Sequence, residues 1–219
     1  MAYRLRDGLS FCIVGGRTIF LDIHADRYFC CPSALETDLQ MMTEGKVPAS
    51  SRGIDWLVEH RVLVENDATP GGLTTVSIVA PQTSISPGSD PPPSPLAVAV
   101  ALAAQLRASA WLRAVPLRQV VDGLAKLKAK LEASSARDDL VRRGALAFQY
   151  AGGLLSRRDR CLPHSIALAR YYWRKGHPAD LVIGVRRAPF AAHCWVQDRR
   201  HVLNDESDHV RSYTPIWML

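Results

Sequence analysis

The sequence of 219 residues lacks several features that would place it in a common class of protein. Its N-terminus, Met-Ala-Tyr-Arg-Leu-Arg-Asp, has no hydrophobic core of the kind found in signal peptides. The most apolar stretch, residues 96–104, has about half the length of a membrane span, and Gln105 and Arg107 close it. We therefore expect a soluble, cytoplasmic protein that does not bind a membrane.

Cysteine is scarce and irregularly spaced. The five cysteines are Cys12, Cys30, Cys31, Cys161 and Cys194. An odd number without a regular framework argues against a secreted disulfide scaffold and favours a reducing compartment.

Nucleic-acid motifs and Gly-rich phosphate loops are also missing, although the net charge is +6. The basic residues are scattered, and no basic run carries interleaved aromatic residues. A solvated basic surface is the simpler interpretation, and attraction of an acidic partner is the alternative. We expect no nucleic-acid partner, and no cofactor bound by this chain.

The N-terminal region has the pattern of short strands followed by helices. Alternating apolar residues at 9–13, a run at 18–23 and an aromatic run at 27–31 predict three strands. Ser33 and Glu36 have the spacing of a capping box, so a helix is predicted to start there. The expected architecture is a small three-stranded, winged-helix-like domain with helices packed on one side of the sheet.

Proline marks the boundary between two domains. Seven prolines fall in residues 70–95, which excludes a core helix or a central strand for most of that stretch. Residues 73–79 can still form an extended strand of the first domain. We predict a first domain at 1–80, a linker at 81–94 and a second domain at 95–219.

The second domain begins with helices and ends with strands, an α+β arrangement. Helical periodicity is found at 95–113, 117–132, 137–155 and 162–175. Strand patterns follow at 181–186, 192–197 and 201–205, and they predict an antiparallel sheet.

Cys161 is predicted to begin the fourth of these helices. A thiol at a helix N-terminus lies at the positive end of the macrodipole, which stabilises the thiolate. Arginines at 157, 158 and 160 add positive charge. A lone cysteine in such a place is more often a buried structural residue, so a catalytic interpretation requires a partner.

Hairpin geometry supplies that partner. If a three-residue loop, 198–200, joins the strands 192–197 and 201–205, then His193 lies opposite Asp205. Directly opposed residues have Cβ atoms about 5 Å apart, so the carboxylate can orient the imidazole and leave its other nitrogen for a thiol. A loop of a different length would break this pairing.

A constellation of Cys161, His193 and Asp205 would attack an acyl carbon through the thiolate. The alternative is that His193 and Asp205 form an ordinary polar pair on a sheet face. A zinc site of Cys161, His164, His193 and Cys194 is disfavoured, because adjacent strand residues point to opposite faces. We therefore expect no metal site.

Four blocks resemble the lasso-peptide B proteins, which are transglutaminase-like cysteine peptidases. They are Cys161-Leu-Pro-His-Ser-Ile-Ala-Leu-Ala-Arg170 and residues 176–185, 189–196 and 203–205. The family has a Cys at a helix start, a His before a small residue and Trp, and an Asp after a short turn. Cys161, His193 and Asp205 match these positions, and Cys194 stands where many relatives have a small residue. The resemblance implies a papain/transglutaminase-like second domain with these three residues as its catalytic triad.

Residues 1–80 resemble the PqqD-like element that recognises leader peptides in the same systems, so this chain is similar to the fused form. That resemblance implies that a leader adds as a strand to residues 27–31 and packs on the last helix of this domain, near Ile54 and Leu57. The residues expected to bind it are Arg27, Tyr28, Phe29, Cys30, Cys31, Ile54 and Leu57. A plain structural role in the sheet and core is compatible with this, because alternate residues face opposite ways.

The resemblances together imply a leader peptidase that cuts a lasso precursor peptide between leader and core. They also imply a partner, the asparagine-synthetase-like lasso cyclase, on which we place the use of ATP. Acyl transfer by the same triad is one alternative. A non-catalytic precursor-binding scaffold for the cyclase is another, and the three intact triad positions argue against it.

Overall fold

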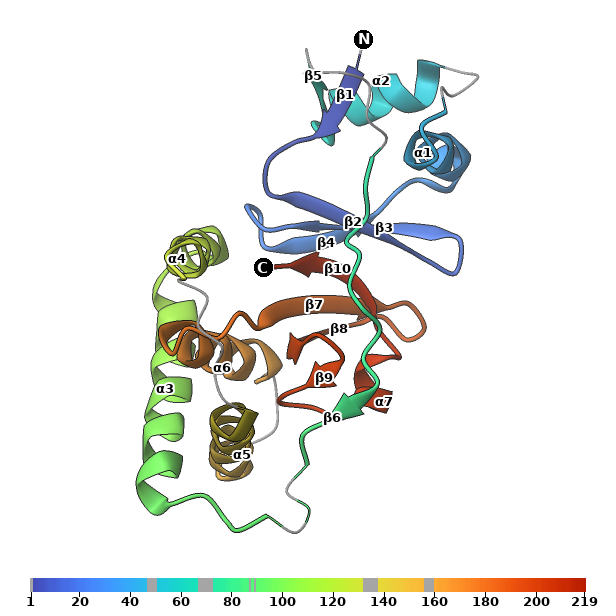
Figure 1. Ribbon diagram of the computed structural model, residues 1–219. Helices are drawn as coiled ribbons and strands as arrows, with labels where there is room; N and C mark the ends of the chain where they lie inside the picture. Colours follow the sequence, from blue (N-terminus) through green and yellow to red (C-terminus); the bar gives the residue numbers. More distant parts are fainter. Residues whose placement is uncertain are drawn as a thin grey trace. The chain divides into compact units, whose positions relative to one another are not determined.

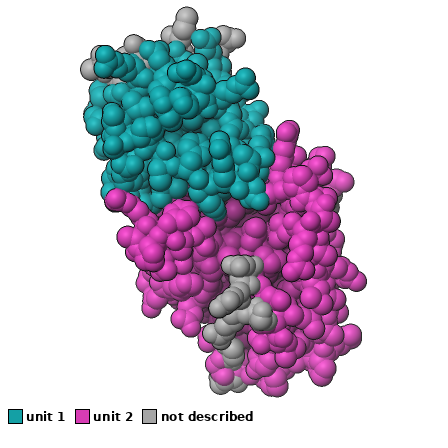
Figure 2. All heavy atoms as spheres, turned by 180° about the vertical axis from the view of Figure 1, so that it is seen from behind, with its two compact units in different colours: residues 1–77 teal, residues 78–219 magenta. Residues whose placement is uncertain are grey.

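The computed structural model describes residues 2–46, 51–66, 73–86, 88, 90–131, 138–155 and 160–219. The chain divides into two compact units, residues 1–77 and 78–219, each of mixed helix and strand (Figure 2).

A three-stranded antiparallel sheet forms the centre of the first unit. It consists of β2 (Leu9–Val14), β3 (Arg17–Asp22) and β4 (Arg27–Cys30), with β3 in the middle and β4 at one edge. All three predicted strands are confirmed. Asp22 accepts hydrogen bonds from the backbone N–H groups of His24 and Ala25, both at 3.1 Å, and so holds the turn that leads into β4.

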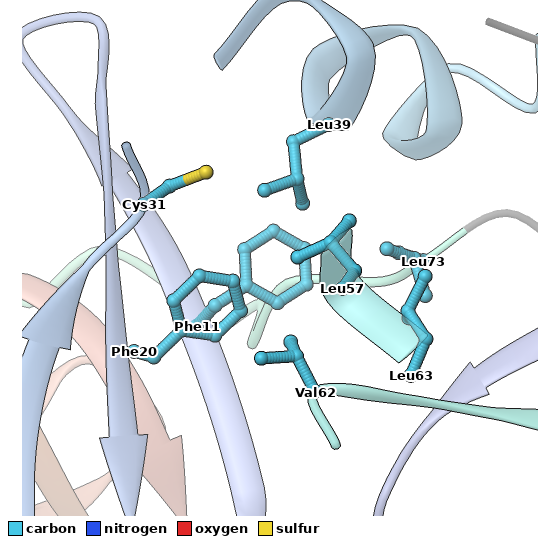
Figure 3. Close-up of a cluster of buried hydrophobic side chains, with 8 residues drawn as sticks. All are labelled: Phe11, Phe20, Cys31, Leu39, Leu57, Val62, Leu63 and Leu73. Atoms are coloured by element: carbon cyan, nitrogen blue, oxygen red, sulfur yellow. The ribbon is translucent and has the colours of Figure 1, made fainter. Parts of the chain in front are cut away.

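Two helices cover one face of this sheet. A single 3₁₀ turn (Ser33–Leu35) precedes α1 (Glu36–Thr43), and α2 (Ser51–Glu59) follows. Their buried leucines meet the phenylalanines of β2 and β3 in one apolar cluster (Figure 3). The cluster contains Phe11, Phe20, Cys31, Leu39, Leu57, Val62, Leu63 and Leu73. A second, two-stranded sheet of β1 (Ala2–Leu5) and β5 (Leu63–Asn66) was not predicted from the sequence.

The predicted capping box is wrong, although a helical segment does start at Ser33. The side chain of Ser33 makes no capping hydrogen bond, because the residue lies inside the 3₁₀ turn. Glu36 instead reaches across to the sheet, where its carboxylate accepts from the backbone N–H of Thr18 at 2.9 Å and from the Thr18 hydroxyl at 2.6 Å. Arg17 lies 3.3 Å from the same carboxylate. Glu36 therefore ties the helical layer to β3.

Glu36→Ala is expected to destabilise the first unit by about 2–3 kcal/mol, because it leaves two buried donors of Thr18 without an acceptor. Urea unfolding monitored by circular dichroism measures this decrease in the free energy of unfolding. Glu44→Ala is the matched control, since Glu44 forms an exposed ion pair with Lys46 and its removal should barely move the midpoint. Equal midpoints for the two variants would contradict this role of Glu36.

The predicted linker at 81–94 is in part structured. β6 (Thr83–Ser84) pairs in parallel with β9 (His201–Val202), and the second unit begins at Ile78. Residues 73–79 do not form the expected strand, because no ladder pairs with them among the described residues. Leu73 packs in the core of the first unit, whereas Ile78 packs in the second. Prolines on both sides confine the regular pairing to two residues, 83 and 84.

In the second unit, the order of helices followed by the strands of a sheet agrees with the prediction, but the sheet has five strands where three were predicted, and one of them, β6, precedes the helices (Figure 1). The helices are α3 (Pro95–Ala114), α4 (Leu117–Ala129), α5 (Asp138–Gly153) and α6 (Cys161–Arg174). The sheet order is β10-β7-β8-β9-β6, with β7 (Asp180–Arg186), β8 (Ala191–Asp198) and β10 (Thr214–Met218), and the short α7 (Ser207–Val210) precedes β10. The sheet is antiparallel except for the β6–β9 pair, which makes it mixed.

α6 is the central helix of this unit and lies between the sheet and the other helices. Its residues Ile166, Leu168, Ala169 and Tyr172 are all at most 1% exposed. α6 packs on β7 and β8 on one side, and α3 and α5 pack on its other side. This packing fixes the start of α6 beside the middle of β8.

α3 begins as predicted, because the Ser94 hydroxyl accepts from the backbone N–H of Ala97 and Pro95 occupies the first turn. In the part of the chain that the structure describes, α3 is the one helix long and apolar enough to cross a membrane by length and composition. Ala101, Gln105 and Ala108 are buried, and the Gln105 amide donates to the backbone carbonyl of Phe148 at 2.9 Å. One face of α3 is thus committed to packing within the helical layer.

Candidate active site

Cys161 is the first residue of α6 and is half-buried. No side chain caps this helix end, so its first backbone N–H groups remain available. The backbone N–H groups of Leu162 and Cys194 contribute to lowering the pKa of the Cys161 thiol, after the larger contribution of His193. Arg160 precedes Cys161, whereas the predicted arginines at 157 and 158 lie outside the described residues.

His193 lies on β8, opposite Gly184 of β7. Only glycine fits at position 184, because an added Cβ atom would lie 2.8 Å from the ring of Trp195. Trp195 is 1% exposed and its indole N–H donates to Gln197 at 3.1 Å. Tight packing under β8 therefore holds the strand that carries His193.

The predicted hairpin register is wrong by one residue. Asp198 pairs with His201 and Gln197 with Val202, so the loop consists of residues 199 and 200 only. Arg199 adopts a left-handed backbone conformation with φ of 51°, which allows this tight turn. Continued as a regular ladder, that register would place Asp205 opposite Cys194, one residue short of His193 and on the other face of the sheet.

The histidine–aspartate pair nevertheless forms, with His193 Nε2 and Asp205 Oδ2 2.5 Å apart. Regular pairing of β9 ends at Val202, and the chain then bends away from β8. The side chain of Asn204 continues the ladder in place of the backbone, since its Oδ1 accepts from the N–H of Val196 at 2.7 Å. This irregular bend turns Asp205 back toward His193.

Asn204 also connects the bend to α6. Its Nδ2 donates to the Ser165 hydroxyl at 2.9 Å, and that hydroxyl donates to the backbone carbonyl of Cys194 at 2.9 Å. Ser165 is fully buried one turn after Cys161. The network therefore couples the helix that carries Cys161 to the strand that carries His193.

Asp205 joins two histidines. Its Oδ2 accepts from His193, and its Oδ1 accepts from His209 Nδ1 at 3.0 Å and from the backbone N–H of Glu206 at 2.7 Å. Burial raises the pKa of Asp205, but the hydrogen bonds, led by that from His193, hold it below its usual value. The carboxylate is therefore ionised at neutral pH.

Cys161 and His193 form a coupled pair. Burial lowers the pKa of His193, but hydrogen bonds to Asp205 and Cys161 outweigh it and raise this pKa to about 9. Burial raises the pKa of the Cys161 thiol, and the hydrogen bond and charge of His193 reverse this and lower it below its usual value. The arrangement shifts the equilibrium toward a thiolate–imidazolium pair.

The pH dependence of Cys161 alkylation by iodoacetamide follows from this pair. The rate is expected to rise with pH at a lower pH than for an ordinary thiol, whose pKa is about 8.5, because the pKa of Cys161 is lowered. Mass spectrometry of the labelled peptide measures the rate. A rate that first rises above about pH 8 would show that His193 does not stabilise the thiolate.

A cavity of about 490 Å³ opens at these residues. Cys161, His193 and Asp205 line one part of it, and Gln105, Gln149, Gly152 and His164 from the helical layer line another. Burial lowers the pKa of His164 to about 4, so its ring is neutral at physiological pH. The cavity gives an acyl substrate room beside the thiolate.

Two residues of the site were not predicted from the sequence. His209 lies four residues after Asp205, and this i, i+4 spacing at the start of α7 was the available signal. Asn204 had no such signal, because its role depends on where β9 ends.

The disfavoured zinc set of Cys161, His164, His193 and Cys194 is not the group of residues that could share an ion in this structure. Among the described residues, the group that could share an ion is His193, Asp205 and His209, whose ligand atoms lie within 4.8 Å of one another. Cys194 is 3% exposed, and burial raises the pKa of its thiol, which keeps it protonated.

Comparison with known protein families matches residues 100–218, more than half of the chain, to the transglutaminase-like superfamily. No curated protein and no solved structure matches the chain. The matched residues run from within α3 to the end of β10 and contain Cys161, His193 and Asp205. Superfamily members are usually cysteine-dependent peptidases or acyltransferases. A thiol at a helix start beside a histidine–carboxylate pair suits that chemistry, and the chain belongs to the transglutaminase-like superfamily.

Proposed function

We propose that Cys161, His193 and Asp205 are the catalytic residues of a peptide hydrolase. The observation that carries this proposal is the continuous hydrogen-bonded chain from the Cys161 sulfur through His193 to Asp205 at the rim of a cavity. A nucleophile, a base and a group that orients the base are the three parts that covalent acyl chemistry requires.

In the proposed reaction the Cys161 thiolate attacks the peptide carbonyl carbon. The imidazolium of His193 protonates the leaving amine as the C–N bond breaks, which leaves a thioester on Cys161. His193 then takes a proton from water while the water oxygen attacks the thioester, and the acid departs as the thiolate is restored. Asp205 keeps the imidazole oriented and stabilises its protonated form throughout.

The transient oxyanion needs donors close to the sulfur. The backbone N–H of Cys161 itself, at the start of α6, is our first candidate. The backbone N–H of Cys194 is the second, because it contributes to lowering the pKa of the Cys161 thiol.

The substrate we propose is a lasso precursor peptide, cut between leader and core in the cytoplasm. This rests on the resemblance of four blocks around the triad to the lasso-peptide B proteins. We further propose that the first unit is a PqqD-like, winged-helix-like recognition domain for the leader. β4 supports this, because it is the edge strand of its sheet and an extended peptide can add to such an edge.

The expected leader-binding residues differ in accessibility. Arg27 and Cys30 are exposed, and Tyr28, Phe29 and Ile54 are half-buried. Cys31 and Leu57 are 1% and 0% exposed and belong to the apolar core (Figure 3). Because the core covers the side chains of Cys31 and Leu57, we leave them out of the proposed contact surface. The proposed contact surface is β4 with Ile54.

The proposed partner is the asparagine-synthetase-like cyclase that closes the lasso ring, and ATP is used there. Incubation of the chain with a lasso precursor peptide in H₂¹⁸O, with and without the cyclase, tests the function by mass spectrometry. Hydrolysis predicts a free leader carrying one ¹⁸O atom at its new C-terminus. Leader released without ¹⁸O and joined to an added amine would favour acyl transfer instead. An intact precursor under both conditions would contradict the proposed substrate.

A further inference from the structure

A second cavity, of about 520 Å³, lies among the helices of the second unit. Its apolar lining includes Val100 on α3, Phe148 on α5 and Tyr171 on α6. Cys161, His193 and Asp205 do not line it, so it is distinct from the candidate active site.

Four cations surround this cavity, namely Arg107, Arg170, Arg174 and Lys175. The lining contains no carboxylate, and among the described residues none of the four forms an ion pair. Such a cluster on apolar walls attracts anionic groups, since the low-dielectric walls strengthen its field.

Arg170 is held in place at the cavity wall. Its guanidinium lies 4.6 Å from the centre of the Trp111 ring, in a cation–π contact. Burial, and then the nearby charge of Arg174, lower the pKa of Arg170 below its usual value. Arg170 is half-buried and Arg174 is exposed, and an anion bound between these two like charges would relieve their repulsion.

The apolar wall of the cavity continues along the outer face of α3. Leu96, Val100 and Leu106 are 75%, 53% and 50% exposed, and Val100 belongs to both the cavity and this outer face. In Figure 1, α5 and α6 lie on one side of α3 and leave its other flank uncovered. Helices of soluble domains normally carry polar residues on such a face, so this one is unusual.

We propose that the cavity and the outer face of α3 together form a docking surface for an acidic segment of a partner protein. An apolar side chain of the partner enters the cavity, and its carboxylates pair with Arg107, Arg174 and Lys175. This inference is independent of the peptidase proposal.

A protein partner suits the surface better than a small anion, because a small anion would leave Leu96 and Leu106 exposed. A second copy of this chain is disfavoured, since it would bring two sets of the same four cations together. The net charge of +6 further favours association with an acidic partner.

The test uses two fluorescent helical peptides made of Leu and Ala with either Glu or Lys at the polar positions. Fluorescence anisotropy with the full chain should show binding of the Glu peptide, weakened by salt, and much weaker binding of the Lys peptide. The double variant Arg107→Glu/Arg174→Glu should weaken binding of the Glu peptide by at least about tenfold. Val100→Asp should weaken it as well, because it places a carboxylate in the apolar part of the surface.

The matched control is Arg118→Glu/Arg143→Glu, which changes the net charge equally at exposed arginines outside the surface. Its affinity for the Glu peptide should lie within about twofold of that of the unmodified chain. Unchanged circular dichroism melting and an unchanged rate of Cys161 alkylation verify that every variant is folded.

Three results would overturn the proposal. The first is a Glu peptide that does not bind, or that binds all variants equally. The second is binding to phosphatidylglycerol vesicles, lost in Val100→Asp, when the Glu peptide fails to bind, which would assign the surface to a membrane. The third is a dimer in sedimentation velocity that Val100→Asp dissociates, which would assign it to self-association.

Discussion

Cys161→Ala is expected to abolish cleavage of the precursor peptide while leaving its binding unchanged. The substitution removes the sulfur that forms the thioester, and Cys161 is the cysteine whose side chain interacts with the His193 ring. Loss of a covalent nucleophile typically lowers kcat by about 10⁵–10⁶. Mass spectrometry measures cleavage, and anisotropy of a labelled leader peptide measures binding.

Cys12→Ala is the matched control, because it removes a thiol of the first unit whose pKa burial raises to about 12. Its cleavage rate should equal that of the unmodified chain. Cleavage by Cys161→Ala would rule out Cys161 as the nucleophile. Loss of leader binding in a folded Cys161→Ala variant would instead count against a separate recognition domain.

His193→Ala is expected to lower the cleavage rate by about 10³-fold or more, since one residue serves as acid and base in both half-reactions. It should also change the chemistry of Cys161 itself. Without the imidazolium, the pKa of the thiol rises, so alkylation by iodoacetamide at pH 7 should become slower. This second readout separates a chemical role of His193 from a merely structural one.

His201→Ala provides the control for this variant, because His201 is exposed on the neighbouring β9 and its ring contacts Thr83. Both its cleavage rate and its alkylation profile should match those of the unmodified chain. If His193→Ala cleaves slowly but alkylates with an unchanged pH profile, His193 does not stabilise the thiolate in the way that we propose.

Cleavage by the unmodified chain should also decline above about pH 9, where His193 loses its proton. The raised pKa of His193 means that the imidazolium acid is present below that value and lost above it. Alkylation of Cys161 needs only the thiolate and should not decline there. If cleavage and Cys161 alkylation had the same pH profile above about pH 9, this would contradict the assignment of His193 as the proton donor.

Much of the fold could be predicted from local patterns. The strands of the first unit are short apolar runs between turn residues, and the four helices of the second unit carry apolar residues at helical spacing, although β3 and α6 are buried on more than one face. α6 was also predictable. Its helical pattern begins at Cys161, and Gly176 and Pro178 limit its C-terminal end. These features depend on residues close together in the chain.

The pairing of His193 with Asp205 was predicted correctly from an incorrect register. A regular hairpin with a two-residue loop would have separated the two side chains. The Asn204 side chain makes the pairing possible. Its Oδ1 accepts the hydrogen bond from the backbone N–H of Val196 in place of a backbone carbonyl, so the chain can bend here. This use of a side-chain acceptor depends on Ser165, whose hydroxyl accepts from the Asn204 amide and which lies 39 residues away in the sequence.

The sequence alone therefore determined the main helices, the strands β2 to β4 and β7 to β9, their order and the three residue types of the candidate site, since periodicity and caps act over a few residues. Only the tertiary structure decided how Cys161 meets His193, why Asp205 turns back, and that Glu36 serves the sheet and not its own helix. It also brought Arg107 and Arg174 to one cavity from two helices. Contacts between distant segments depend on packing, and local sequence patterns do not encode which distant donor a side chain will reach.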